Sequence, residues 1–160
     1  MAALLCTQMD SVIYEDIPKT DAWMRLIVFF PSSLLLTAAL FIPPKDQAAA
    51  VFMILFAIVV AGIIFCIIPV KYCILDSKIR IGFRGSIHFD IPYETVVTVR
   101  RSRWSTVGIN LPANMSQANA VEIIRQKRLA VAITPTDQQV FIGYFEEAFN
   151  NWRKYRGQTS

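Results

Sequence analysis

The sequence predicts an α+β membrane protein in which a two-helix transmembrane hairpin precedes a small antiparallel β-domain with a C-terminal capping helix. Three observations predict this architecture. The 160-residue chain is 54% hydrophobic and only 18% charged, whereas average proteins are about 25% charged. Its apolar residues are concentrated in two blocks of the N-terminal half. After residue 70 the apolar pattern changes from continuous to alternating, which is typical of strands.

Two apolar blocks are each long enough to cross a membrane. No charged residue occurs within residues 26–42 or 48–70, and a spanning helix needs about 20 apolar residues. The first block reaches this length when Arg25 extends its charge to the membrane interface. The alternative, two buried helices of a soluble protein, would leave too little chain to cover them. We therefore expect spanning helices at about residues 23–42 and 48–70.

The two blocks are joined by a short polar turn. Pro43 and Pro44 end the first helix, and residues 45–47 reverse the chain. Thirteen Lys and Arg residues follow residue 70 but the turn holds one, so the positive-inside rule places both termini in the cytoplasm. The predicted division of the chain is a cytoplasmic N-terminal segment at 1–21, the hairpin at 22–70 and a cytoplasmic domain at 71–160.

The N-terminal segment has mixed polarity. A short interfacial segment that faces something apolar is suggested by Val12, Ile13, Tyr14 and Ile17. Leu4-Leu5-Cys6 superficially resembles a lipoprotein cleavage site, but a signal peptide needs a basic start and a longer apolar stretch before the cut. We therefore expect neither cleavage nor lipidation.

Alternating residues predict strands in the second half of the chain. Lys78 and Arg80 alternate with Ile79 and Ile81, which indicates a half-buried strand. Pro92 excludes a central position for the strand that precedes it. The predicted strands are residues 72–75, 78–83, 87–91, 96–103, 121–126 and 129–134, with turns at 76–77, 84–86 and 127–128 and a brief strand at 107–111 inside an irregular loop.

The last element is a predicted helix. Thr134 is suited to cap it, Pro135 to its first position and Asp137 to its first turn. An apolar, mainly aromatic stripe at steps of three or four residues marks one face: Phe141, Phe145, Ala148, Trp152 and Tyr155. Such spacing is typical of a helix that closes a core. The alternative is a ligand-binding or protein-docking face.

Two proline-containing segments carry a resemblance. They are Ile91-Pro92-Tyr93-Glu94-Thr95-Val96 between two strands, and Ile133-Thr134-Pro135-Thr136-Asp137 before a helix with Phe141. With a strand pair directly after a membrane hairpin, residues 70–155 resemble the bacterial pleckstrin-homology-like (PH-like) domains of small membrane proteins. The resemblance implies a bent, partly open antiparallel β-barrel of about seven strands, plugged at one end by the helix. It also implies a place in the bacterial inner membrane. It transfers no function, because this fold serves lipid, peptide and protein contacts alike.

Residues suited to catalysis are scarce. The lone His88 shares a strand face with Asp90, but a metal site would need a third ligand from elsewhere. Cys6, Cys66 and Cys73 form no close pair or redox motif. Phosphate-binding and hydrolase motifs are missing from the sequence. We therefore expect no enzyme activity, no metal and no cofactor, and the basic charge alone does not indicate a nucleic-acid partner.

Basic residues form the candidate contact surface. Two basic groups are predicted to lie near each other on neighbouring strands. One is Arg100, Arg101, Arg103 and Trp104, and the other is Lys78, Arg80 and Arg84. This surface suits anionic lipid head groups or an acidic partner, and the alternative is a solvated strand face. The leading hypothesis is a non-enzymatic, membrane-anchored interaction or assembly module, such as an accessory subunit of a larger membrane complex. Its expected partners are membrane lipids and other membrane subunits or a second copy. The alternative function is an anionic-lipid-responsive membrane module.

Overall fold

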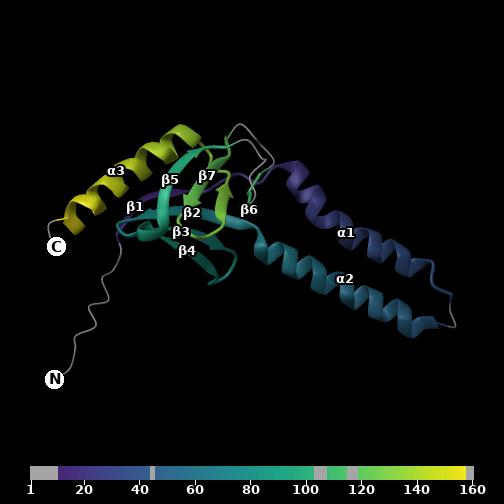
Figure 1. The fold of residues 1–160 in the computed structure, drawn as a ribbon. Helices are drawn as coiled ribbons and strands as arrows, with labels where there is room; N and C mark the ends of the chain where they lie inside the picture. The colour runs from purple at the N-terminus through teal and green to yellow at the C-terminus, as the bar shows by residue number, and fades with distance from the viewer. Residues whose placement is uncertain (1–10, 44–45, 103–107, 115–118, 158–160) are drawn as a thin grey trace, which may run out of the picture.

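A computed structural model describes residues 11–43, 46–102, 108–114 and 119–157. The fold is α+β, as predicted. A pair of long helices, α1 (Ala22–Leu40) and α2 (Gln47–Ile67), projects from a β-domain that carries the C-terminal helix (Figure 1). The hairpin therefore extends away from the rest of the molecule.

The helix boundaries follow from local chemistry. The Asp21 carboxylate caps α1 by accepting a hydrogen bond of 2.7 Å from the backbone N–H of Met24. Helix α2 ends at Ile67, three residues before the predicted limit at residue 70. A residue that precedes proline is disfavoured in helical conformation, and Ile68 is extended before Pro69. The last three residues predicted for the hairpin therefore lead into and begin the next strand.

The first sheet joins both ends of the hairpin. Its antiparallel order is β1-β2-β3-β4, with bounds Val12–Asp16, Pro69–Leu75, Lys78–Phe83 and His88–Pro92. Strand β1 precedes α1, and β2 follows α2; their register runs from Val12 opposite Leu75 to Asp16 opposite Tyr72. Residues 12–16 are thus an edge strand of the β-domain, where the sequence suggested an interfacial segment.

The second sheet contains one parallel pair. Its order is β5-β7-β8-β6, with bounds Val96–Arg101, Val121–Arg125, Ala130–Ile133 and Gly108–Leu111. Strand β6, the predicted brief strand, pairs parallel with β8, and the other neighbours are antiparallel. Gly108 is required here, because a Cβ would collide with the Ala130 carbonyl oxygen.

The described residues form no closed β-barrel, whereas the sequence predicted a bent, partly open one. In the described part of the chain, the strands form two four-stranded sheets that no closed ladder joins. Between β4 and β5 the chain makes a 3₁₀ turn at Tyr93–Thr95, directly after Pro92. Proline has no N–H to donate and tends to end a ladder. The chain therefore leaves the first sheet at this point and enters the second.

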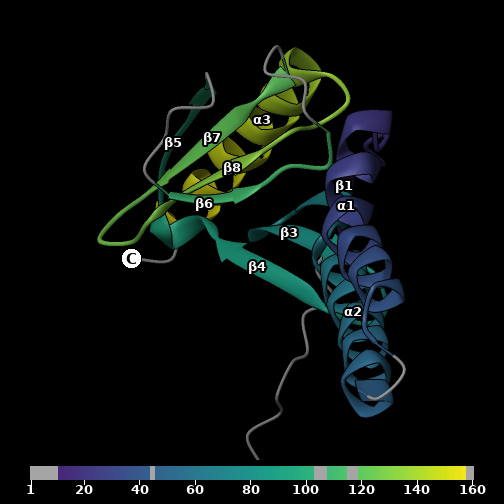
Figure 2. The same cartoon turned by 90° about the vertical axis from the view of Figure 1, so that its right-hand side faces the viewer.

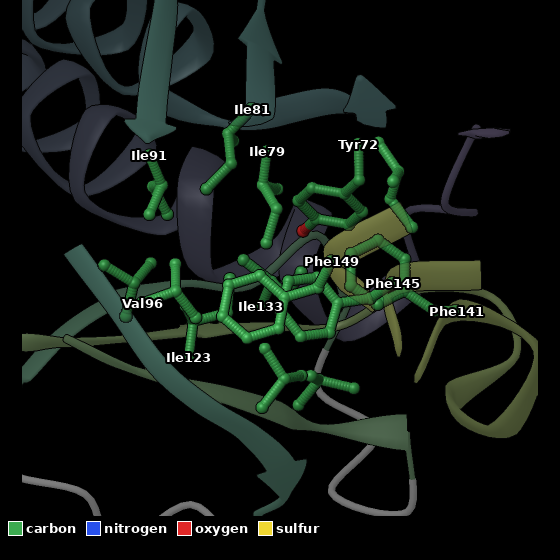
Figure 3. Packing of buried hydrophobic residues seen from close by; sticks show 14 of the residues in the cluster. Tyr72, Ile79, Ile81, Ile91, Val96, Ile123, Ile133, Phe141, Phe145 and Phe149 are labelled. Carbon is green, nitrogen blue, oxygen red and sulfur yellow. The ribbon is translucent and has the colours of Figure 1, made fainter. Parts of the chain in front are cut away.

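The hydrophobic core lies where the two sheets and α3 (Gln138–Gly157) meet (Figure 3). Fully buried isoleucines from both sheets pack there: Ile79, Ile81 and Ile91 from the first, Ile123 and Ile133 from the second. Helix α3 contacts β1, β2 and β5. Both sheets and α3 thus build the core, and the partly buried Tyr14 of β1 packs against it.

Helix α3 begins later than predicted. Asp137, not Thr134, is its cap, and its carboxylate accepts backbone hydrogen bonds of 2.9 and 3.1 Å. Thr134 precedes Pro135 and is therefore disfavoured as helix; its hydroxyl instead accepts a hydrogen bond of 2.8 Å from the Ala113 N–H. The helix start is set by a tertiary contact as well as by local sequence.

The predicted stripe of α3 is buried in part. Phe141, Phe145 and Ala148 are buried as expected, whereas Tyr155 is 72% exposed. Phe149, which the stripe omitted, is buried and stacks on Phe145 with ring centroids 5.3 Å apart. The helix closes the core between Phe141 and Trp152, and its end extends beyond the sheets (Figure 1).

Candidate functional site

The hairpin exposes an apolar surface. Both helices are long and apolar enough to cross a membrane, and the most apolar stretches of α1 and α2 are only 20% and 6% buried. Exposed side chains include Phe30, Phe52 and Ile58. Burial is confined to a few positions such as Ser32, Ala39 and Ala57. The described domain thus leaves most of the apolar surface of both helices uncovered.

The predicted contact residues are divided between two sheets. Lys78 and Arg80 lie on β3, with Arg84 directly after it, whereas Arg100 and Arg101 lie on β5. Arg103 and Trp104 fall outside the described residues. Strands β3 and β5 belong to different sheets, and Figure 2 separates β5 from the helices and places β3 nearer to them. The residues predicted to form one basic surface therefore lie on two different sheets.

Asp90 forms ion pairs with both basic residues of β3. Arg80, which is opposite Asp90 in the register, donates two hydrogen bonds to its carboxylate, at 2.8 and 2.9 Å. Lys78 lies 3.2 Å from the same carboxylate. The hydrogen bonds from Arg80, and then those of Lys78, hold the pKa of Asp90 below its ordinary value. These charges form a cross-strand cluster that stabilises the β3–β4 hairpin.

We expect Asp90→Asn to lower the free energy of unfolding by about 1–2 kcal/mol at pH 7, the range for a partly exposed, charge-assisted pair. Because the folded pKa of Asp90 is depressed, its contribution is full above the unfolded pKa of about 4 and is lost as the pH falls through the folded value. Denaturant unfolding at pH 7 and in strong acid measures this difference, with Glu94→Gln as an exposed control. An equal difference at both pH values would contradict the assignment.

The other described residues of the predicted contact surface, Arg84, Arg100 and Arg101, each have different neighbours. Arg100 donates from Nε to the buried Glu122 at 2.8 Å, a cross-strand pair on β5 and β7. Arg101 is exposed at the end of β5. Arg84 lies against the hairpin instead, with its guanidinium carbon 3.6 Å from the centre of the Phe65 ring. Arg84 is thus the predicted contact residue that touches a long apolar helix.

The described residues offer little for catalysis. In this part of the chain, no group of three or more His, Cys, Asp or Glu side chains is arranged to hold a metal ion. His88 is exposed, and its Nδ1 lies 3.3 Å from the Ser86 carbonyl oxygen. Burial, and then the charge of Glu15, raises the pKa of the Cys73 thiol, which disfavours the reactive thiolate.

The structure contains a groove between the end of α3 and the first sheet that the sequence did not predict. It has a volume of about 650 Å³ and is lined by Ile13, Asp76, Ser77, Glu147, Ala148, Asn151, Trp152 and Tyr155. The groove depends on β1, which supplies Ile13 to its wall. The sequence analysis also did not identify Asp90 as the ion-pair partner of Arg80, although a turn centred on Gly85 places these two residues opposite each other. That hairpin register was the available signal.

Comparison with known proteins finds no matching family model, no matching curated protein and no matching solved structure. The function is therefore inferred from the residues of this chain.

Proposed function

We propose that this chain is a non-enzymatic integral membrane protein of the bacterial inner membrane. In this proposal the α1–α2 hairpin anchors a cytoplasmic, PH-like interaction or assembly module, and the protein acts as an accessory subunit of a larger membrane complex. The observation that carries the proposal is the uncovered apolar surface of both helices, which are 20% and 6% buried over their most apolar stretches. Burying such a surface in lipid removes it from water at no cost in backbone hydrogen bonds.

The pairing of β1 with β2 supports a two-span arrangement. The strands flank the hairpin and run antiparallel, with Asp16 opposite Tyr72. Both outer helix ends are therefore held at the same domain. A single span followed by a soluble helix would pull this strand pair to opposite sides of the membrane. The strand pairing therefore supports two spans rather than one.

Charge distribution supports the cytoplasmic orientation. After residue 70 there are 13 Lys and Arg residues, whereas the loop between the helices holds only Lys45. Lys71 follows the end of α2 closely. Basic residues that flank spanning helices are retained on the cytoplasmic side.

The β-domain supports the interaction role by its organisation. Two sheets and a C-terminal helix in this order are in keeping with the PH-like resemblance, although the sheets form no closed barrel. The groove beside α3 presents Trp152 and Tyr155 next to the carboxylates of Asp76 and Glu147. Aromatic residues are enriched in protein interfaces. These features suit a module that contacts other proteins.

Gentle purification tests the proposal. We expect the full-length tagged protein, extracted from native membranes in mild detergent, to elute as an assembly with a second copy or with other membrane subunits. Light scattering gives the mass and mass spectrometry gives the components, and an unrelated tagged two-span protein shows the background. A clean monomer with no specific co-purifying protein would contradict the assembly role.

A further inference from the structure

The β3–β4 turn (residues 84–87) folds back onto the end of α2. The Arg84 guanidinium carbon lies 3.6 Å from the centre of the Phe65 ring, a close cation–π contact. Gly85 supplies the positive φ of +80° that reverses the chain. The start of β4 lies beside α2 in Figure 2. The turn is therefore the part of the β-domain that is held against the hairpin.

The position of Phe65 sets the depth of this turn. Phe65 precedes the last α2 residue, Ile67, by two positions, which is about 3 Å along the helix axis. If α2 spans the membrane, as in the proposed function on which this inference rests, the end of α2 lies at the boundary between acyl chains and head groups. A guanidinium stacked on Phe65 then lies close to that boundary, within reach of lipid phosphates.

We propose that the β3–β4 turn is a lipid-contact site in which Arg84 binds the phosphate of an anionic lipid head group and Ile87 enters the edge of the acyl-chain region. The stacked face of a guanidinium contacts the ring, so its N–H edge stays available for bidentate bonds to phosphate oxygens. Ile87 is 61% exposed at the same turn. An exposed apolar side chain beside a basic one is suited to the membrane interface.

Electrostatics distinguish Arg84 from its basic neighbours. Lys78 and Arg80 both bind Asp90, whereas no carboxylate among the described residues forms an ion pair with Arg84. The turn also borders a groove of about 260 Å³ whose lining includes His88 and Lys71, the latter paired with Glu15. The positive charge of Arg84 at this end of α2 is therefore available to bind the phosphate of an anionic lipid.

Spin labels measure the depth of the turn in the full-length protein. The labels are attached singly at Ile87→Cys, at Val97→Cys on β5 and at Val59→Cys in α2, in a background without Cys6, Cys66 and Cys73. These side chains are 61%, 53% and 55% exposed. In vesicles of equal phosphatidylglycerol and phosphatidylcholine, we expect the labels at 87 and 59 to be open to oxygen and shielded from a water-soluble nickel chelate, and the label at 97 to be open to the chelate.

The three positions separate two kinds of failure. The label at 59 could lie in lipid while the label at 87 is open to the nickel chelate. This result would overturn the lipid-contact site but would support the membrane hairpin. A label at 87 shielded from both oxygen and chelate would show a protein partner on the turn and would also overturn the site. A label at 59 open to the chelate would refute the membrane hairpin itself.

Lipid binding tests the role of Arg84 directly. Native mass spectrometry of the full-length protein in detergent, with both lipids supplied equally, gives the ratio of bound phosphatidylglycerol to phosphatidylcholine. We expect Arg84→Gln to lower this ratio about fivefold, the effect of one basic group at an anionic surface, and the charge-matched Arg101→Gln to leave it unchanged. An unchanged ratio in Arg84→Gln, or loss of bound phosphatidylglycerol in millimolar inorganic phosphate, would overturn the head-group assignment.

Discussion

Replacing Phe145 by alanine is expected to lower the free energy of unfolding of the β-domain by about 3–5 kcal/mol, the usual cost of a buried phenylalanine. Phe145 is 2% exposed. Its ring packs edge-on against Tyr93 at 5.7 Å and stacks on Phe149 at 5.3 Å. Alanine would leave a cavity where α3 meets both sheets. Denaturant unfolding of the purified protein, followed by circular dichroism, measures the change.

Tyr155 provides the matched control for this prediction. It is an aromatic residue on the same helix, but it is 72% exposed. Tyr155→Ala should therefore change the free energy of unfolding by no more than about 0.5 kcal/mol, as is usual for surface substitutions. Similar losses for both variants would mean that α3 does not pack on the sheets through its first turns.

Replacing Asp16 by alanine is expected to lower the free energy of unfolding by about 2–3 kcal/mol, the cost of removing a buried charged hydrogen-bond partner. Asp16 ends β1 and is 5% exposed. Its Oδ2 accepts a hydrogen bond of 2.7 Å from the Thr136 N–H, between β8 and α3. Alanine would leave this N–H without that acceptor and would release the end of β1. The same unfolding measurement reports the loss.

Glu15 is the control beside Asp16. Its side chain is 41% exposed, and it lies 3.5 Å from the Lys71 Nζ. Exposed ion pairs contribute little, so Glu15→Ala should cost at most about 0.5 kcal/mol. If Asp16→Ala lowered the free energy of unfolding no more than Glu15→Ala, the hydrogen bond from Thr136 to Asp16 would not hold the N-terminal strand against the rest of the domain.

Elements with a local signal were predictable from sequence. The alternation of Lys78, Ile79, Arg80 and Ile81 predicted β3, and the structure confirms it with both isoleucines buried and both basic residues partly exposed. The two apolar helices were predictable for a similar reason, because their length and lack of charge are properties of continuous segments. Local periodicity reports which face of an element is buried.

Elements that depend on distant partners were not predictable. Strand β1 has only five residues, and it is defined by pairing with β2 across the whole hairpin. The parallel pairing of β6 with β8 and the late start of α3 at Gln138 depend likewise on contacts between separate segments. The contact of Arg84 with Phe65 was hidden for the same reason. Because the sequence did not reveal β1, it could not predict the groove beside α3 or the attachment of both helix ends to one sheet.

Cysteine accessibility in intact cells tests most directly the claim that α1 and α2 form a membrane hairpin with the β-domain in the cytoplasm. In a background without Cys6, Cys66 and Cys73, single cysteines are placed at Gln47, the first residue of α2, and at Asn150 on the exposed face of α3. A membrane-impermeant thiol reagent should label position 47 in intact cells and position 150 only after lysis. Labelling of position 150 before lysis, or protection of position 47 until lysis, would contradict the topology.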